Sequence, residues 1–350
     1  MNTYQVKAFG TPSKDADLKE MTIERRDILP KDIEIDILYC GVCHSDLHTA
    51  RNDWGGTKYP SIPGHEIVGK VTKIGNEVTK HKVGDTVAVG CMVDSCRSCN
   101  NCEQDLEQYC EKGMTGTYNG NDKHLGVHTF GGYSEKIVVE EHFVLKVPDN
   151  LDLAAVAPVL CAGITTWSPL RHWNVGAGSK VAVIGLGGLG HMAIKLAKGL
   201  GADVTLFSRT PSKTEDAKKL GAGSVIISTN NEEMKAAKGS FDLIIDTVPY
   251  EHDINPYMTT LKINGTLVLV GFLGTFESVL NSRPLIGGRR SVAGSVIGGI
   301  AETQELLNFC GEHNIVSDIE MIDIQNINKA YERMLKSDVK YRFVIDMKSL

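Results

Sequence analysis

Residues 181–190 read Val181-Ala182-Val183-Ile184-Gly185-Leu186-Gly187-Gly188-Leu189-Gly190. The stretch begins with an apolar run of the length typical of a buried parallel strand and continues into a Gly-x-Gly-x-x-Gly pattern. The apolar face of a helix follows, with Leu189, Met192, Ala193, Leu196 and Leu200. A strand, these glycines and a helix in this order predict a dinucleotide-binding loop, because glycines let the backbone approach a pyrophosphate whose charge is favoured at a helix N-terminus. The alternative is a flexible glycine loop in an unrelated α/β protein.

The alternation of strands and helices continues after this stretch. Further strands are expected at 204–207, 224–227, 243–246 and 267–270, with helical segments such as 213–220 between them. This alternation indicates an α/β fold with a parallel, doubly wound Rossmann sheet. After Ser295 the pattern becomes mixed again. There we expect helices at 302–313 and 324–336 and a closing strand at 341–346.

The chain before residue 148 has a different pattern, made of short β-like segments. Ile33-Glu34-Ile35-Asp36-Ile37 alternates strictly between apolar and acidic side chains, and 86–89 and 136–139 are rich in β-branched residues. Glycine and asparagine recur between these segments, which is typical of many turns. We therefore expect a small β-barrel that carries functional residues on its loops.

A group of cysteines within this β-rich part has the spacing of a metal site. The spacing is Cys-x2-Cys-x2-Cys-x7-Cys, formed by Cys96, Cys99, Cys102 and Cys110. Four thiolates can close a tetrahedral shell, which predicts a structural zinc. A bacterial iron–sulfur run would place its last cysteine after three residues and follow it with proline, whereas Glu111 follows Cys110. A nucleic-acid-binding zinc ribbon is disfavoured because 94–112 contains five acidic and two basic residues.

A second group of possible ligands lies in Cys40-Gly41-Val42-Cys43-His44-Ser45-Asp46-Leu47-His48. A thiolate suits zinc, a neighbouring hydroxyl can pass a proton, and a carboxylate can orient a metal-bound imidazole. Further candidate ligands are His65, in the run Gly64-His65-Glu66-Ile67-Val68-Gly69, and the distant Cys161. Three protein ligands would leave one coordination position open, as in catalytic zinc sites. Taken singly, these cysteines would more often be small core residues.

The runs 41–46 and 64–69 together closely resemble the zinc-dependent medium-chain alcohol dehydrogenases, in particular their cinnamyl alcohol dehydrogenase branch. The resemblance extends over nearly the whole chain. It implies a GroES-like zinc-binding catalytic domain of residues 1–156 and 297–350, and a Rossmann dinucleotide-binding domain of residues 157–296. It also implies a catalytic zinc in a cleft between the two domains, with Cys43, His65 and Cys161 as ligands and one position left open.

The resemblance also assigns roles to residues around this zinc. Ser45 would contact the substrate oxygen, and His48 would exchange the proton with solvent through the cofactor ribose. Asp46 would hold His65 in place, and Glu66 could approach the metal when substrate or water leaves. The alternatives are a capping hydroxyl for Ser45, a surface imidazole for His48 and an ordinary salt bridge for Glu66.

By the same resemblance, other residues would contact the cofactor or line the substrate pocket. The implied cofactor contacts are His44, Thr165, Gly185, Leu186, Gly187, Gly188, Leu189, Gly190, Ser208, Arg209, Lys213, Thr247, Val270, Gly271, Ser295 and Arg342. The implied pocket residues are Trp54, Cys91, Val296 and Ile297. An aromatic side chain such as Trp54 would suit an aromatic or medium-length apolar aldehyde, although it could equally be part of the barrel core.

The end of the second Rossmann strand indicates which cofactor is bound. NAD enzymes usually place Asp or Glu about 20 residues past the glycines, where it hydrogen-bonds the ribose 2′-hydroxyl. In this chain Val204-Thr205-Leu206-Phe207 is followed by Ser208, Arg209 and Thr210, and then by Lys213. Hydroxyls and cations can bind a 2′-phosphate, and Arg offers it a planar, multidentate donor. The sequence therefore predicts NADP; the alternative is that Arg209 and Lys213 are merely solvated at a helix start.

A zinc with an open position and a nicotinamide site together suggest hydride transfer between primary alcohols and aldehydes, of the cinnamyl alcohol type. A zinc-free quinone reductase would share the glycine loop but would need none of the zinc ligands. A zinc-dependent polyol dehydrogenase commonly has Glu where Cys161 stands. A non-catalytic nucleotide-binding redox sensor would use its cysteines as a switch without turnover.

Composition limits the partners and the compartment. The 350 residues are 42% hydrophobic and 23% charged and carry a net charge of -6, so we expect a small-molecule substrate rather than nucleic acid or a membrane. Residues 1–14 lack the apolar segment of a secretory signal, and no apolar run approaches the ~18 residues of a membrane span. Nine cysteines, an odd number, favour reduced thiols, and Cys40, Cys91 and Cys310 are expected to be buried apolar residues. We expect a cytoplasmic protein and, by resemblance, a homodimer.

Overall fold

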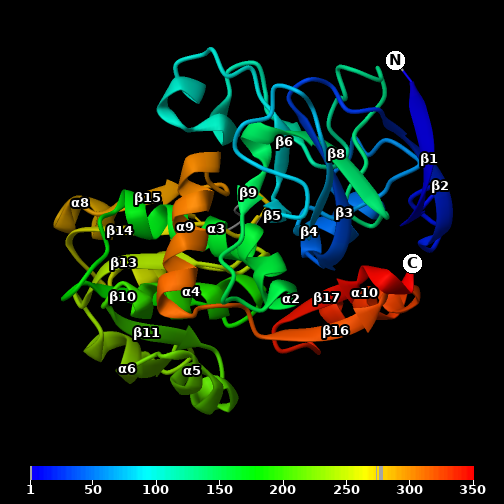
Figure 1. Cartoon of the computed structure of the whole chain (residues 1–350). Coiled ribbons are helices and arrows are strands. Elements are labelled where there is room, and N and C mark those ends of the chain that lie inside the picture. The colour runs from blue at the N-terminus through cyan, green and yellow to red at the C-terminus, as the bar shows by residue number, and fades with distance from the viewer. Residues whose placement is uncertain (1, 273, 276–278) are drawn as a thin grey trace. The chain divides into compact units, whose positions relative to one another are not determined.

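The computed structural model describes residues 2–272, 274–275 and 279–350. Contacts divide the chain into two compact units (Figure 1). Unit 1 consists of Met1–Cys161 and Gly298–Leu350, and unit 2 consists of Ala162–Ile297. The domain boundaries expected after residues 156 and 296 lie close to these limits. Each unit has its own β-sheet and is described separately.

Within the described residues, unit 2 contains a six-stranded parallel sheet with the order β12-β11-β10-β13-β14-β15. The strands are β10 (Lys180–Ile184), β11 (Asp203–Ser208), β12 (Ser224–Ile227), β13 (Phe241–Asp246), β14 (Leu261–Leu269) and β15 (Ser291–Gly294). This doubly wound order confirms the predicted fold class of unit 2. The strand order reverses between β10 and β13, which is where such sheets bind their ligands, outside the carboxyl ends of the strands.

Helices connect these strands and shield the sheet from solvent. They are α3 (Ala162–His172), α4 (Gly188–Gly199), α5 (Thr214–Leu220), α6 (Asn231–Ala236), α7 (Asn255–Met258) and α8 (Ser282–Gly288). Val181, Ala182 and Val183 of β10 are fully buried, as expected for a parallel strand that is covered on both faces. Met192 and Leu196 on the apolar face of α4 are also fully buried. The apolar run and the helix face read from the sequence therefore form the core of this unit.

Unit 1 is built on a largely antiparallel sheet with the order β16-β17-β3-β4-β5-β9, in which β8 also pairs with β3. Its strands are β3 (Asp32–Gly41), β4 (Ile67–Ile74), β5 (Thr86–Val89), β8 (Lys136–Glu140), β9 (Leu145–Lys146), β16 (Ile319–Asp323) and β17 (Arg342–Asp346). Two separate two-stranded antiparallel sheets accompany it, β1 (Thr3–Gly10) with β2 (Lys19–Arg26) and β6 (Met92–Asp94) with β7 (Thr115–Gly116). Because β17 pairs with β3, the C-terminal segment belongs to the same sheet as the N-terminal part of the chain.

Short helices complete unit 1. The α-helices are α1 (His44–Ala50), α2 (Leu153–Val156), α9 (Ile300–His313) and α10 (Ile327–Leu335). The 3-10 turns include η1 (Cys102–Gln104), η2 (Glu107–Tyr109), η4 (Ala157–Leu160) and η6 (Ile324–Asn326). The helix expected over 324–336 is thus a 3-10 turn followed by a shorter α-helix. The expected helix over 302–313 is present and begins slightly earlier, at Ile300.

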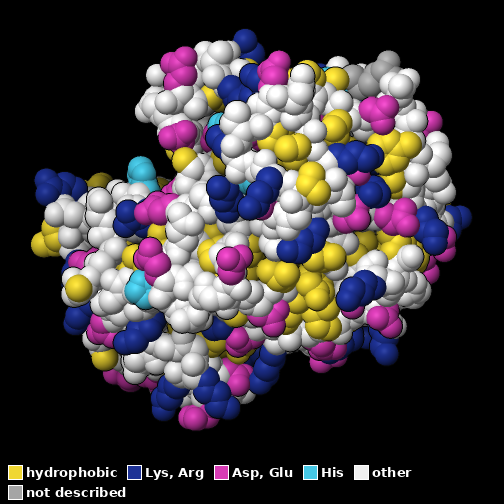
Figure 2. All heavy atoms as spheres, in the orientation of Figure 1, with side chains coloured by type: hydrophobic (Ala, Val, Ile, Leu, Met, Phe, Trp, Pro, Cys, Tyr) yellow, Lys and Arg dark blue, Asp and Glu magenta, His cyan; other side chains and the backbone are white. Residues whose placement is uncertain are grey.

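Charged side chains of both signs are intermixed on the face of the molecule drawn in Figure 2, in keeping with the modest net charge of -6. Among the residues that the structure describes, no single helix is long and apolar enough to cross a bilayer. One bent pair of consecutive helices, Leu153–Leu160 with Ala162–His172, meets the length and composition criteria together.

Candidate active site

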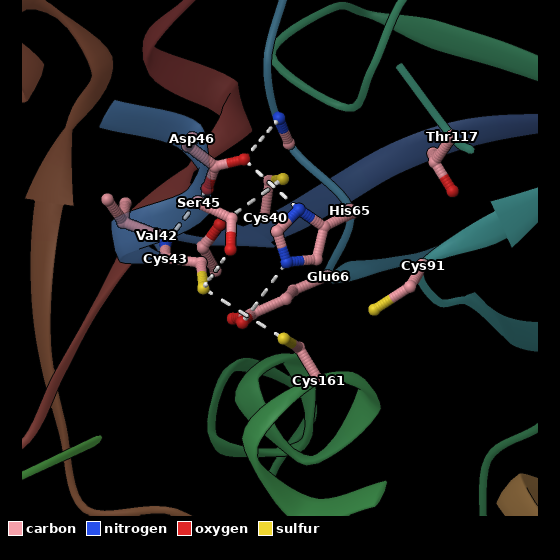
Figure 3. Close-up of polar contacts among 12 residues, drawn as sticks. Cys40, Val42, Cys43, Ser45, Asp46, His65, Glu66, Cys91, Thr117 and Cys161 are labelled. Carbon is pink, nitrogen blue, oxygen red and sulfur yellow. Dashed lines mark hydrogen bonds and ion pairs between the residues drawn. The ribbon is translucent and has the colours of Figure 1, made fainter. Parts of the chain in front are cut away.

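The candidate active site lies at one end of the antiparallel pair β3 and β4 in unit 1. The last residues of β3 pair with the first residues of β4, so the segments flanking this end of the ladder lie next to each other. Cys43 shortly follows β3, and His65 and Glu66 directly precede β4. Cys161 comes from the end of η4 in the same unit. Figure 3 shows these four side chains pointing toward a common point.

The chemistry of these four side chains fits a zinc ion. One ligand atom from each of Cys43, His65, Glu66 and Cys161 lies within 4.8 Å of all the others, and the two sulfur atoms are 3.9 Å apart. Thiolate and imidazole are preferred zinc ligands. The Oε2 atom of Glu66 is buried and has no hydrogen-bond partner in the described part of the chain, so this oxygen is available to a cation. Two thiols, an imidazole and a nearby carboxylate thus provide the ligand chemistry of a catalytic zinc site.

Asp46 orients the imidazole of His65. Its Oδ1 lies 3.2 Å from Nδ1 of His65 and accepts a hydrogen bond from the Gly64 backbone N–H at 3.0 Å. Its Oδ2 accepts the Cys43 backbone N–H at 2.8 Å, which caps the first turn of α1, and the Tyr133 hydroxyl at 3.3 Å. A proton on Nδ1 leaves Nε2 of His65 as the free ligand atom. One buried carboxylate therefore fixes both the helix start and the orientation of His65.

Glu66 is held by a buried arginine from the C-terminal strand. Arg342, the first residue of β17, forms an ion pair with Oε1 of Glu66 and donates a hydrogen bond to the Val42 carbonyl at 2.8 Å. Both side chains are buried. The salt bridge considered for Glu66 is thus present in the structure, while its approach to the metal remains a prediction. The contact of Arg342 with a cofactor pyrophosphate also remains a prediction, because this guanidinium is engaged by Glu66 and Val42.

The charges around the site favour a thiolate at Cys43. The hydrogen bond with Cys161 lowers the pKa of Cys43 well below its usual value, and His65 adds to this effect against the opposing effect of burial. Burial raises the pKa of Glu66 to about 7, although the neighbouring Arg342 charge opposes the rise. The same hydrogen bond raises the pKa of Cys161. A bound cation would stabilise both thiolates, since metal ligands must be deprotonated.

The two residues proposed for proton transfer occupy different positions around this cluster. Ser45 Oγ lies 3.6 Å from Cys43 Sγ and is therefore next to the ligand cluster (Figure 3). His48, one turn further along α1, pairs through Nδ1 with Asp53 Oδ2 at 2.8 Å and packs against the ring of Trp54 at 5.1 Å. Its side chain is 26% exposed, so it has access to solvent. His44, at the start of α1, is exposed.

The second cysteine cluster forms a separate, closed site. The Sγ atoms of Cys96, Cys99, Cys102 and Cys110 all lie within 4.8 Å of one another. Backbone N–H groups point at these sulfur atoms, from Cys96 to Cys110 at 3.4 Å and from Glu111 to Cys99 at 3.5 Å. Such contacts stabilise thiolates. Four sulfur ligands and no open position are the arrangement of a structural zinc.

The glycine loop of unit 2 has the geometry that dinucleotide binding requires. Gly185 has a φ of 89°, in the left-handed region that favours glycine. A Cβ on Gly190 would collide with the Gly185 carbonyl oxygen, so α4 can pack this close to β10 only with glycine there. Gly187 precedes α4, and a Cβ at this position would meet nothing within 4 Å. The N-terminus of α4 is thus open to an approaching phosphate.

Other predicted cofactor contacts lie at the carboxyl ends of the same parallel strands. Thr247 follows β13, Val270 and Gly271 follow β14, and Ser295 follows β15. In a parallel sheet these ends share one edge, to which Gly185 also belongs. Thr165 lies on α3, where it is buried. The Thr247 hydroxyl donates a hydrogen bond to the Ile184 carbonyl at 2.8 Å, which ties β13 to the start of the glycine loop.

The end of β11 presents polar and cationic groups to this edge. Ser208 is the last residue of β11, and its hydroxyl donates a hydrogen bond to the Thr210 carbonyl at 2.7 Å. Arg209 is exposed, and its guanidinium lies over the ring of Tyr250 at 5.9 Å from the centroid. Lys213 ends the 3-10 turn that precedes α5. These two cations fit a 2′-phosphate, whereas the Ser208 hydroxyl is engaged by the Thr210 backbone.

The predicted pocket residues belong to both units. Cys91 is half-buried, and its sulfur lies 3.7 Å from the Leu160 carbonyl oxygen, on the Cys161 side of the site (Figure 3). Trp54 is 48% exposed, so it is not part of the barrel core. Val296 and Ile297 are in unit 2. The pocket expected from these four residues remains a prediction.

Family models match both parts of the chain. The alcohol dehydrogenase GroES-like domain matches residues 29–149, and the zinc-binding dehydrogenase model matches residues 188–312. The chain belongs to the zinc-binding alcohol dehydrogenases. This membership confirms the family resemblance and the GroES-like part of the predicted fold.

Relatives of this alcohol dehydrogenase match along its whole length. Aldehyde reductase YahK of Escherichia coli K12 is 54% identical over 347 residues, which cover 99% of each chain. NADP-dependent alcohol dehydrogenase C 1 of Mycolicibacterium smegmatis is also 54% identical, over 346 residues and 99% of each chain. Among solved structures, a cinnamyl alcohol dehydrogenase of Sorghum bicolor superposes with a TM-score of 0.94 at 42% identity, covering 99% of this chain and 98% of the other.

Several residues of this alcohol dehydrogenase's site were not identified from the sequence. Tyr133 donates its hydroxyl to Asp46, and the ring of Tyr118 packs at 5.5 Å from that of His65. Neither tyrosine lies in a motif, and only the folded chain brings them to the site. Burial was expected for Cys40, Cys91 and Cys310. Cys40 and Cys310 are both 0% exposed, whereas Cys91 is only half-buried.

Proposed function

We propose that this zinc-binding dehydrogenase transfers hydride reversibly between NADP(H) and primary alcohols or aldehydes, with aromatic and medium-chain substrates preferred. The observation that carries the proposal is the convergence of Cys43, His65 and Cys161 beside the buried Glu66. The names of the relatives, an aldehyde reductase and an NADP-dependent alcohol dehydrogenase, support the reaction class and the cofactor. The similarity to a cinnamyl alcohol dehydrogenase supports the aromatic substrate class.

The proposed ligands are Cys43, His65 and Cys161. A zinc ion held by these residues would supply a Lewis acid for the substrate oxygen. Asp46 keeps Nε2 of His65 directed at the ligand cluster. Arg342 neutralises Glu66 and keeps this carboxylate close to the cluster. The positions of these groups are therefore set before the substrate binds.

We propose that Ser45 and His48 move the proton that accompanies the hydride. Ser45 Oγ, beside Cys43, donates its proton to the substrate oxygen during aldehyde reduction and accepts it during alcohol oxidation. His48 exchanges that proton with solvent, and the contact with Asp53 holds its ring in place. This assignment is supported by the nearness of Ser45 to the ligand cluster and by the partial exposure of His48.

NADP is the proposed cofactor because of the groups at the end of β11. Ser208, Arg209 and Lys213 offer a hydroxyl and positive charge where NAD enzymes usually have an acidic residue. An acid would repel a 2′-phosphate, whereas Arg can donate two hydrogen bonds to it. The open N-terminus of α4 suits the pyrophosphate of the same molecule. Trp54 is proposed to contact the apolar part of the substrate.

We further propose a cytoplasmic homodimer. None of the cysteines in the described residues forms a disulfide, which is typical of a reducing compartment. Unit 2 exposes apolar side chains on and before α8, where Ile286 is 81% and Val279 is 89% exposed. Exposed apolar residues of this kind are typical of a subunit contact. Sedimentation of the protein and of Ile286→Glu tests the dimer, which the charge should weaken.

One panel of assays tests the proposed reaction. Aromatic, medium-chain and polyol substrates should be compared with NADPH and NADH at one pH and one ionic strength. The proposal predicts rapid reduction of aromatic aldehydes with NADPH and a much lower kcat/KM with NADH. Ser208→Asp combined with Arg209→Ala should reduce the use of NADPH far more than that of NADH. Turnover of polyols alone, or equal efficiency with both cofactors, would contradict the proposal.

A further inference from the structure

A buried acid and an imidazole beside the proposed cofactor edge have no role in the function described so far. Asp246, the last residue of β13, is 0% exposed. Its Oδ1 accepts the Val248 backbone N–H at 3.1 Å, and its Oδ2 lies 3.0 Å from Nε2 of His252. The second contact is an ion pair rather than an aligned hydrogen bond, and Oδ2 has no aligned donor among the described residues. The charge of this buried carboxylate therefore depends on His252 for its balance.

The surroundings of His252 favour a proton on both ring nitrogens. Nδ1 lies 3.0 Å from the backbone carbonyl oxygen of Tyr250, and Nε2 faces the carboxylate of Asp246. A carbonyl oxygen accepts only, and a carboxylate beside the ring favours its charged form, so both contacts favour the doubly protonated imidazole. The contact with Asp246 raises the pKa of His252, against partial burial. Glu251 on the same segment raises it further, and the Tyr257 ring of α7 lies 6.2 Å away.

His252 thereby connects β13 to the segment that carries Tyr250. The ring contacts Asp246 on one side and the Tyr250 backbone on the other. The Tyr250 side chain then lies under the Arg209 guanidinium, at 5.9 Å. Arg209 follows β11, and the sheet order is β11-β10-β13, so this chain of contacts passes from one side of β10 to the other. It crosses the carboxyl end at which the glycine loop begins.

We propose that His252 is a positioning residue for recognition of the 2′-phosphate of NADP. Its imidazolium joins Asp246 to the Tyr250 backbone and so keeps the Tyr250 ring under Arg209. Arg209 is exposed and would otherwise sample many rotamers, and the aromatic face limits these to conformations with a free guanidinium edge. Preorganisation of this kind lowers the entropic cost of binding a phosphate. The inference rests on the NADP preference proposed above.

The main competing explanation is that Tyr250 stacks on the adenine rather than on Arg209. Tyr250 is 51% exposed, so its ring is accessible to a base. The two explanations differ in which cofactor they affect. Adenine is common to NADH and NADPH, so loss of stacking would weaken the binding of both cofactors equally. Loss of the positioning of Arg209 would weaken the binding of NADPH alone, because only NADPH carries the 2′-phosphate.

Dissociation constants of the full-length, zinc-loaded protein test the proposal. They should be measured for NADPH, NADH and adenosine 2′-monophosphate with the unmodified protein, His252→Gln, Tyr250→Ala and the conservative Tyr250→Phe. His252→Gln and Tyr250→Ala should raise the dissociation constants of NADPH and adenosine 2′-monophosphate by about three- to tenfold. The dissociation constant of NADH should rise by less than about twofold. Tyr250→Phe retains the aromatic face and should keep most of the preference. His172→Gln, which alters an exposed imidazole of the same unit, is the matched control.

Measurements against pH separate positioning from general destabilisation. The imidazolium is lost as pH rises through the raised pKa of His252, so the NADPH preference of the unmodified protein should fall over that range. The 2′-phosphate itself titrates near pH ~6, and it does so for every variant. The NADPH preference of His252→Gln should therefore show the phosphate titration but not the fall that the loss of the His252 imidazolium causes. A fall in thermal stability at constant pH would not produce this difference between the two profiles.

Each result supports or overturns the proposal. If NADPH and NADH bind equally to the unmodified protein, the proposed NADP function fails. If the unmodified protein prefers NADPH and a folded His252→Gln keeps that preference, the positioning role of His252 is wrong, whatever the result for Tyr250→Ala. Equal weakening of NADH and NADPH by Tyr250→Ala would assign Tyr250 to adenine and would also overturn the proposal. If His252→Gln does not fold, Tyr250→Ala with the pH profile of the unmodified protein decides the matter.

Discussion

The carboxylate of Asp46 is the most informative position to perturb in the candidate active site. Two backbone N–H groups reach it, from Cys43 at 2.8 Å and Gly64 at 3.0 Å. His65 Nδ1 lies 3.2 Å away and the Tyr133 hydroxyl 3.3 Å away. Asp46→Asn keeps the size of the side chain but replaces one acceptor oxygen with an NH2 group, which would face donors on that side.

The expected effects follow from these contacts. Two buried donors would lose their acceptor, at about 1–3 kcal/mol each, so the free energy of unfolding should fall by about 2–6 kcal/mol. The protein should remain folded at low temperature if its total stability is of the ordinary size, about 5–15 kcal/mol. Because a neutral amide would replace the carboxylate that orients His65, affinity for the catalytic zinc should fall by about 10- to 100-fold.

Zinc release to a graded chelator, followed by metal analysis, measures this effect. The zinc predicted at Cys96, Cys99, Cys102 and Cys110 is the internal control, since Asp46 is not part of that cluster. Asp46→Asn should release one zinc at much lower chelator concentration and the other at the same concentration as the unmodified protein. Unchanged release of both ions, with normal activity, would refute the role assigned to Asp46.

Three further predictions concern the relay, the closed cluster and acid stability. Ser45→Ala should lower kcat by on the order of a hundredfold while zinc and cofactor still bind, and a normal kcat across pH would exclude Ser45 from proton transfer. Cys99→Ser should lower the melting temperature and the zinc content more than the activity per folded molecule, as calorimetry and metal analysis can establish. Glu34 is buried, yet hydrogen bonds from Tyr4, Lys73 and Thr72 outweigh burial and lower its pKa from 4.5 to about 2. A lowered folded-state pKa contributes stability above the unfolded pKa that is lost as pH falls through about 2. Melting temperatures of the unmodified protein and Glu34→Gln should thus differ most near pH 7 and converge toward pH 2, and a constant difference would contradict this reading.

The Rossmann sheet could be predicted from the sequence because its signals are local. A buried parallel strand such as β10 is apolar throughout, and the glycines follow it directly, so neither depends on distant residues. The start of β14 was not predicted, since Leu261–Leu269 includes Lys262, the exposed Ile263 and Asn264. Its pairing with β13 shifts register near Phe241, and a sequence pattern does not reveal such a shift. The short edge strand β15 (Ser291–Gly294) was also not predicted, because its sequence has little apolar content.

The candidate site shows a similar division between local and distant information. Cys43, Ser45 and Asp46 lie near one another because Cys43 is the N-cap of the short helix that carries the other two. Cys161 could be linked to them only through the family resemblance, because 118 residues separate it from Cys43. The ion pair between Glu66 and Arg342 joins residues 276 positions apart and depends on β17 pairing with β3. No periodicity or motif in a single sequence carries that pairing.

The contacts that set Asp246 apart from other residues at strand ends are also visible only in the folded chain. Its sequence neighbours gave no indication that His252 would balance its charge or that Tyr250 would reach Arg209. These contacts depend on the path of the segment after β13 and on the order of three strands. The cations after β11 could be read from the sequence, but the residues that position them could not.

The central claim is that Cys43, His65 and Cys161 hold the zinc at which an aldehyde is reduced by NADPH. Its most direct test is the rate of NADPH oxidation with an aromatic aldehyde for the unmodified protein and Cys161→Ser, together with the zinc content of each. The account predicts that Cys161→Ser retains its fold and the zinc of the closed cluster, loses the second zinc, and has no measurable turnover. Near-normal turnover by Cys161→Ser would contradict the account.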